Sequence, residues 1–181
     1  MKKRKRKILT LFDSGALITS AKFRVRDRLI IDYVVDCCRV NLSPEVKHET
    51  IDMGLLFGYQ DAQDLANRLD KGIFLVLNTA VRDDALESIL TNLGLEYADC
   101  AIVHTYKSMS SQTKLITDDH RLFISTTRLG FSPIFFPDLI LMLVNKEWMK
   151  AALATEILEA MQPRYAKGFI DLTLKRLKGV I

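Results

Sequence analysis

Acidic side chains follow two apolar, strand-like runs of this chain, directly where each run ends. Asp13 closes the run at residues 8–12, and Asp118 and Asp119 close the run at residues 114–117. When such strands are parallel, their carboxyl ends lie at one edge of the sheet, so these acids are expected to lie close together.

Two more acids are predicted to reach the same edge from the starts of helices. Glu49 lies about one and a half turns into the helix that follows a short strand at residues 39–42. Asp99 lies in the first turn of a helix whose next residues, 100–103, are apolar. A carboxylate at the head of a buried helical face is unfavourable unless a cation or another partner compensates it.

Carboxylates gathered in a small space repel one another and raise one another's pKa unless a divalent cation neutralises them. Ligand sets made only of oxygen favour Mg²⁺ or Mn²⁺, and such a site activates water and holds a phosphodiester for in-line attack. The competing interpretation is structural. Asp13 and Asp118 can serve as helix caps, and Glu45, Glu49 and Glu96 can be solvent-facing helix residues. The shared position of the acids relative to strand ends favours the metal site.

The elements that would position these acids alternate between strands and helices. Strands are expected at residues 8–12, 39–42, 73–77, 114–117 and 134–136, with amphipathic helices between them. This order predicts an α/β protein with three layers, in which helices cover both faces of a central, mostly parallel sheet of about four to five strands.

The chain continues beyond this pattern. Residues 8–145 are expected to form the α/β domain, and residues 146–181 a helical C-terminal extension. An apolar stripe in the extension fits either packing on the domain or an interface with a partner. Its members are Trp148, Met149, Leu153, Ile157 and Leu158.

Basic residues are concentrated at both ends. Residues 2–7 carry +6 and residues 164–181 carry +4, and since the whole chain carries +4, the segment between them carries −6. Basic ends on an acidic body favour a polyanionic partner. The three cysteines and three histidines lack the spacing of a zinc site or a disulfide framework. No apolar run reaches the length of a membrane span, so we expect a cytoplasmic protein without membrane association.

Four segments resemble the motifs of PIN-domain ribonucleases and follow that family's order. They are residues 13–18 (DSGALI), 43–49 (SPEVKHE), 99–105 (DCAIVHT) and 115–122 (LITDDHRL). The resemblance covers about residues 8–144. It implies the PIN fold and an endoribonuclease that depends on Mg²⁺ or Mn²⁺, often the toxin of a VapC-type toxin–antitoxin pair and often a homodimer. RNA, an antitoxin protein and a second copy of the chain are therefore the expected partners.

The resemblance also assigns roles to individual residues. The metal-binding and catalytic acids would be Asp13, Glu49, Asp99 and Asp119. The hydroxyls of Thr117 and Ser14 would not bind the metal themselves. They would orient a ligand carboxylate or water through hydrogen bonds. The roles of three acids stay open. Asp118 is either a helix cap or a member of the site, and Glu45 is an alternative to Glu49 as the acid of the second motif. Glu96, one turn before Asp99, is a further candidate for the site.

Two other functions compete with RNA hydrolysis. One is a PIN-fold module that binds RNA or protein and catalyses only weakly; the presence of all four acids argues against it. The other is a phosphate-transfer domain with Asp13 as an aspartyl nucleophile. Residue 15 is a glycine where such a domain would carry a second aspartate, which makes this the weakest of the three hypotheses.

Overall fold

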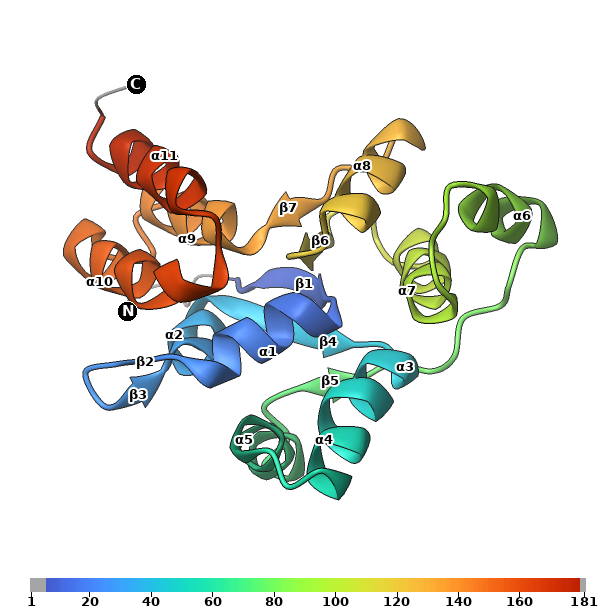
Figure 1. Ribbon diagram of the computed structural model, residues 1–181, viewed down its shortest axis with the longest axis horizontal. Coiled ribbons are helices and arrows are strands. Elements are labelled where there is room, and N and C mark those ends of the chain that lie inside the picture. The colour runs from blue at the N-terminus through green and yellow to red at the C-terminus, as the bar shows by residue number, and fades with distance from the viewer. Residues whose placement is uncertain (1–5, 180–181) are drawn as a thin grey trace.

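A parallel sheet forms the centre of the molecule in the computed structural model, which describes residues 6–179 (Figure 1). In this part of the chain, five strands pair in the order β5-β4-β1-β6-β7. Their bounds are β1 Ile8–Phe12, β4 Cys38–Leu42, β5 Leu75–Val76, β6 Lys114–Thr117 and β7 Ile134–Phe135. The predicted α/β fold with a central parallel sheet is confirmed.

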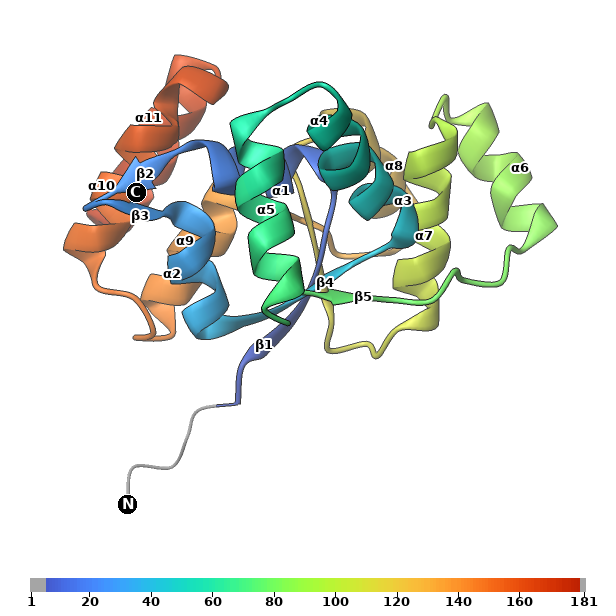
Figure 2. The same cartoon turned by 90° about the horizontal axis from the view of Figure 1, so that it is seen from below.

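Helices connect the strands and flank the sheet. They are α1 Ser14–Lys22, α2 Ile30–Cys37, α3 Pro44–Lys47, α4 Met53–Leu56, α5 Gln60–Asp70, α6 Asp84–Asn92, α7 Tyr97–Ser108, α8 His120–Arg128, α9 Phe136–Asn145, α10 Ala151–Met161 and α11 Lys167–Leu177. Figure 2 shows α5 in front of the sheet, α6 and α7 at one end of the molecule, and α9, α10 and α11 at the other. None of the helices within residues 6–179 is long and apolar enough to span a membrane.

The central place of β1 follows from its sequence. A strand with neighbours on both sides and helices over both faces must be apolar on both faces. In β1, Thr10, Leu11 and Phe12 are fully buried. The Thr10 hydroxyl satisfies its hydrogen-bonding capacity by donating to the carbonyl of Arg39 in β4, at 3.1 Å. β1 thus carries its polar chemistry only at its end, where Asp13 follows.

Two local predictions were inaccurate. The segment between the first two predicted strands was expected to be helical, but part of it forms a hairpin of β2 Arg24–Val25 and β3 Arg28–Leu29. Its two-residue turn places Arg26 and Asp27 at positive φ, as tight hairpins require. The run at residues 73–77 forms only the short edge strand β5, in which Leu75 is 44% exposed. The prediction was too long because apolar composition does not distinguish an edge strand from a central one.

The C-terminal extension packs on the domain. Ile157 and Leu158 in α10 and Ile170 in α11 are fully buried and belong to the same hydrophobic core as β1. Trp148 and Leu153 are partly buried against that core. Of the two roles considered for the apolar stripe, the structure therefore shows core packing.

The close packing of α4 against α5 gives a first prediction. A Cβ added to Gly54 in α4 would lie 2.5 Å from the Cβ of Ala62 in α5, whereas a Cβ added to Gly168 in α11 would meet nothing within 4 Å. Gly168→Ala should stabilise the protein by up to about 1 kcal/mol, since alanine favours the helix. Gly54→Ala should be destabilising by about 1–3 kcal/mol because the helices must separate. Urea unfolding measures both, and equal free energies of unfolding for the two variants would contradict the packing.

Candidate functional site

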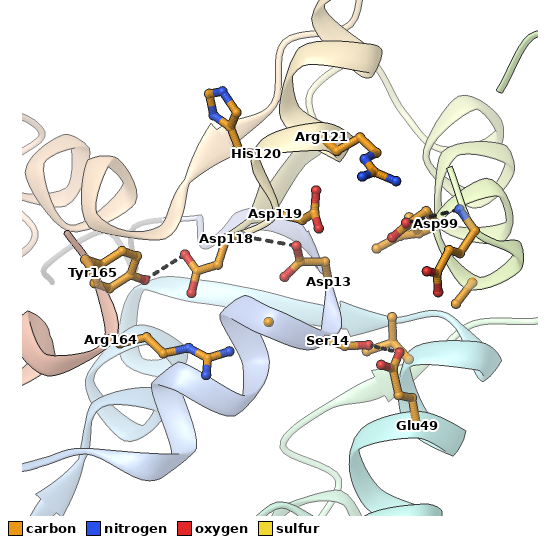
Figure 3. A pocket seen from close by; sticks show the side chains of 15 residues that line it. Asp13, Ser14, Glu49, Asp99, Asp118, Asp119, His120, Arg121, Arg164 and Tyr165 are labelled. Atoms are coloured by element: carbon orange, nitrogen blue, oxygen red, sulfur yellow. Dashed lines mark hydrogen bonds between the residues drawn. The ribbon is translucent and has the colours of Figure 1, made fainter. Parts of the chain in front are cut away.

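An acidic pocket with a volume of about 680 Å³ lies at the carboxyl edge of the sheet (Figure 3). The carboxylates that line it are those of Asp13, Glu49, Glu96, Asp99, Asp118 and Asp119. They come from four separate segments: the end of β1, the helical turn after α3, the start of α7 and the end of β6. Within residues 6–179, no group of three or more His, Cys, Asp or Glu side chains is arranged so that it could hold a metal ion.

Asp13 is the most buried of these acids, with 5% of its surface exposed. Its Oδ1 caps α1 by accepting from the N–H of Ala16 at 2.6 Å. Its Oδ2 accepts from the N–H of Asp118 at 3.1 Å and from the hydroxyl of Thr117. Burial nevertheless raises the pKa of Asp13 to about 7, because desolvation outweighs the hydrogen bonds that favour the carboxylate. Asp13 is thus both a helix cap and a buried acid that resists ionisation at the pocket.

Asp99 and Asp119 face the same space from two helix starts. The carboxylate of Asp99 accepts from the N–H of Glu96 at 3.4 Å, and that of Asp119 accepts from the N–H of Leu122 at 2.7 Å. Burial raises the pKa of Asp99, and the negative charges of Asp119, Glu96 and Glu49 raise it further. These carboxylates therefore act on one another through the pocket.

Glu49 lies in the pocket wall, and Glu45 is not among the residues that line the pocket. The segment His48–Asp52, which carries Glu49, is a π-helical insertion between α3 and α4. Such insertions occur frequently at functional sites. The hydroxyl of Ser14 donates to Oε2 of Glu49 at 2.6 Å, so the start of α1 fixes this acid. Of the two glutamates, Glu49 is thus the one that lines the pocket.

Asp118 has a role that the sequence left ambiguous. It does not cap α8, because Asp119 is the cap. Its Oδ1 accepts from the hydroxyl of Tyr165 at 2.7 Å and its Oδ2 from the hydroxyl of Thr19 at 2.8 Å. Burial raises the pKa of Asp118, while these hydrogen bonds and the charge of Arg164 oppose the rise. Asp118 therefore ties β6 to α1 and to the C-terminal extension.

The contributions of Thr19, Arg164 and Tyr165 were missed by the sequence analysis. Arg164 and Tyr165 line the pocket and belong to the extension, where Arg164 ends the short 3-10 helix Gln162–Arg164 and Tyr165 follows it. In Figure 3 they lie on one side of the carboxylates, and Asp99 and Arg121 lie on the other. Pro163 marks a break between the two helices of the extension, but no sequence feature indicates which part of the domain that break contacts.

No protein-family model matches the chain, and no curated protein matches it. Among solved structures, the chain is similar to the crystal structure of PAE2754 from Pyrobaculum aerophilum, with a TM-score of 0.53 and 19% sequence identity. The similarity covers 76% of this chain and 90% of that one. At this identity the likeness shows that the two proteins share a fold.

The raised pKa of Asp13 predicts how stability depends on pH. The native state binds this proton more tightly than the unfolded chain, where the pKa of aspartate is near 3.9. The free energy of unfolding should therefore fall as pH rises from about 4 to about 7, with a contribution from Asp13 of up to about 4 kcal/mol. Asp13→Asn should remove this contribution, so that the variant gains on the wild type as pH rises.

Urea unfolding at several pH values in EDTA measures this difference. Asp83→Asn is a suitable control, because Asp83 also caps a helix and its pKa is lowered by the ammonium of Lys107. It should not show the gain with pH. Parallel stability curves for the wild type and Asp13→Asn would show that Asp13 does not resist ionisation in the native state.

Proposed function

We propose that this protein is an endoribonuclease of the PIN-domain type, which uses Mg²⁺ or Mn²⁺ to hydrolyse RNA phosphodiester bonds in the acidic pocket. One observation carries the proposal. Acids that are up to 106 residues apart, from Asp13 to Asp119, line one pocket at the edge where parallel strands end. Their order along the chain is that of the PIN motifs. A toxin role with an antitoxin and a homodimeric state are expectations from the family resemblance alone.

The chemistry of the donor set fits a hard divalent cation. Its ligands would be carboxylate oxygens, which Mg²⁺ and Mn²⁺ prefer. Asp13 and Asp99 resist ionisation in the pocket, and a cation beside them would favour their charged forms. Because no three-residue group among residues 6–179 is arranged to hold an ion, some side chains would have to rotate towards it.

The residues of the pocket then divide into three groups. Asp13, Glu49, Asp99 and Asp119 would hold the cation, which when bound would supply the charge that activates water for attack on phosphorus. Thr117 and Ser14 hold Asp13 and Glu49 in place through their hydroxyls. Arg121 and Arg164, on opposite sides of the carboxylates in Figure 3, would contact phosphates of the RNA strand.

A second candidate function is a PIN-fold module that binds RNA or protein without efficient catalysis. Such a module would bind its partner through Arg121 and Arg164, two exposed cations that line the pocket. The two functions differ in what a divalent cation does to the protein. A nuclease should be stabilised by Mn²⁺ and should cleave RNA, whereas a binding module would retain RNA uncut.

RNA cleavage by matched glutamate variants tests the proposal. Glu49→Gln and Asp13→Asn should each lower the rate by about 100-fold or more, because each removes a charge that faces the cation. Glu45→Gln makes the same chemical change one turn earlier, outside the lining of the pocket, and should keep the wild-type rate.

Thermal unfolding with and without Mn²⁺ gives an independent measurement. A ligand that binds only the native state raises the unfolding temperature, so the wild type and Glu45→Gln should respond and Asp13→Asn should respond less. An uncleaved RNA substrate with a folded wild type in both metals would refute the nuclease. Full activity of a folded Asp13→Asn variant would refute the site.

A further inference from the structure

Aromatic side chains from three parts of the chain meet beside the acidic pocket. This aromatic cluster consists of His120 and Phe123 from α8, Phe135 from β7, and Tyr165 and Phe169 from the C-terminal extension. Phe123 stacks on Phe135 with ring centroids 4.1 Å apart, and His120 lies nearly parallel to Phe135 at 6.3 Å. Phe169 meets Phe135 edge-on at 5.4 Å and stacks with Tyr165 at 5.9 Å.

The aromatic cluster is continuous with the pocket. His120 and Tyr165 both line the pocket, and in Figure 3 they lie on the side of the carboxylates away from Glu49 and Asp99. His120 is exposed and the other four rings are partly exposed, whereas the neighbouring Phe136 is fully buried in the core. The rings of the aromatic cluster therefore keep part of their surface available beside an acidic site.

A cation completes the arrangement. Arg164 precedes Tyr165 in the chain, is exposed and lines the same pocket. No ion pair joins Arg164 to a carboxylate within residues 6–179, although the charge of Arg164 does act on Asp118. Flat aromatic surface next to an available guanidinium matches a nucleotide, which has a planar base and an anionic phosphate.

We propose that the aromatic cluster is a base-stacking subsite, which holds an unpaired nucleobase of an RNA strand while Arg164 binds a neighbouring phosphate. The inference rests on the proposed function, because it concerns the strand that the acidic pocket would cleave. The base must be unpaired, since the faces of bases inside a duplex are already covered by their neighbours.

The subsite gives the C-terminal extension a role beyond packing. Tyr165, Phe169 and Arg164 all come from this extension, and the hydrogen bond from Tyr165 to Asp118 fixes them relative to β6. The domain itself supplies only the α8 and β7 rings. The extension would thus complete the binding surface and set where a strand lies relative to the carboxylates.

Binding of RNA in EDTA tests the subsite without cleavage. Isothermal titration calorimetry would compare an oligoadenylate about ten nucleotides long, an abasic ribose-phosphate chain of the same length, and the oligoadenylate annealed to oligouridylate. The wild type should bind the single-stranded oligoadenylate about tenfold or more tightly than the abasic chain, and the duplex should bind as weakly as the abasic chain.

Variants locate the effect in the aromatic cluster. His120→Ala and Phe169→Leu should each lower affinity for the oligoadenylate several-fold and leave affinity for the abasic chain unchanged. Phe131→Leu is the matched control, because Phe131 is also partly exposed but packs edge-on against Tyr106, outside the aromatic cluster. His120 is exposed, so His120→Ala remains informative even if Phe169→Leu unfolds.

Two results would overturn the inference: equal affinity of the wild type for the oligoadenylate and the abasic chain, or wild-type binding by a folded His120→Ala variant. If the aromatic cluster instead holds a second copy of the chain, Phe169→Leu would change the sedimentation coefficient and not RNA affinity, which also overturns it. All binding is measured without divalent cations, so these affinities test the subsite even if the protein does not cleave RNA. If the protein cleaves RNA but shows no preference for bases, the subsite is refuted and the proposed nuclease function is not.

Discussion

The rest of the site depends on one constraint: β1 pairs with β6, and Asp13 is buried where that pairing ends. The backbone N–H of Asp13 donates to the carbonyl of Ile116 at 2.9 Å, and the Asp13 carboxylate accepts from the N–H of Asp118 and the hydroxyl of Thr117. These contacts hold the end of β6 against the start of α1. Asp118 lies within this junction, and helical segments place the other pocket acids, which are Glu49, Glu96, Asp99 and Asp119, relative to it.

This junction also explains the glycine after Asp13 and Ser14. A Cβ at Gly15 would lie 3.3 Å from the Cβ of Asp118, a tight contact that requires one of the two elements to shift by a few tenths of an ångström. The small residue therefore lets the first turn of α1 approach the end of β6. The same approach brings the hydroxyl of Thr19, one turn further along α1, within 2.8 Å of Asp118.

Local sequence signals predicted the parts of the site that depend on single elements. Asp13 and Asp119 were predicted because an apolar run followed by an acid marks the end of a buried strand. Glu49 and Glu45 could not be separated in this way, because both lie in the same predicted helix, and only the tertiary position of the π-helical segment places Glu49 at the pocket. Tyr165 and Arg164 depend on how the extension folds back over β6, which periodicity does not encode.

The electrostatics of the pocket argue against a purely structural role for its acids. A cap is satisfied by one accepting oxygen and is usually solvated, yet Asp13 is buried and its pKa is raised to about 7. Asp99 is likewise held among negative neighbours. Such an arrangement lowers the stability of the native state at neutral pH. Unfavourable local electrostatics of this kind are typical of functional sites, where a ligand supplies the missing opposite charge.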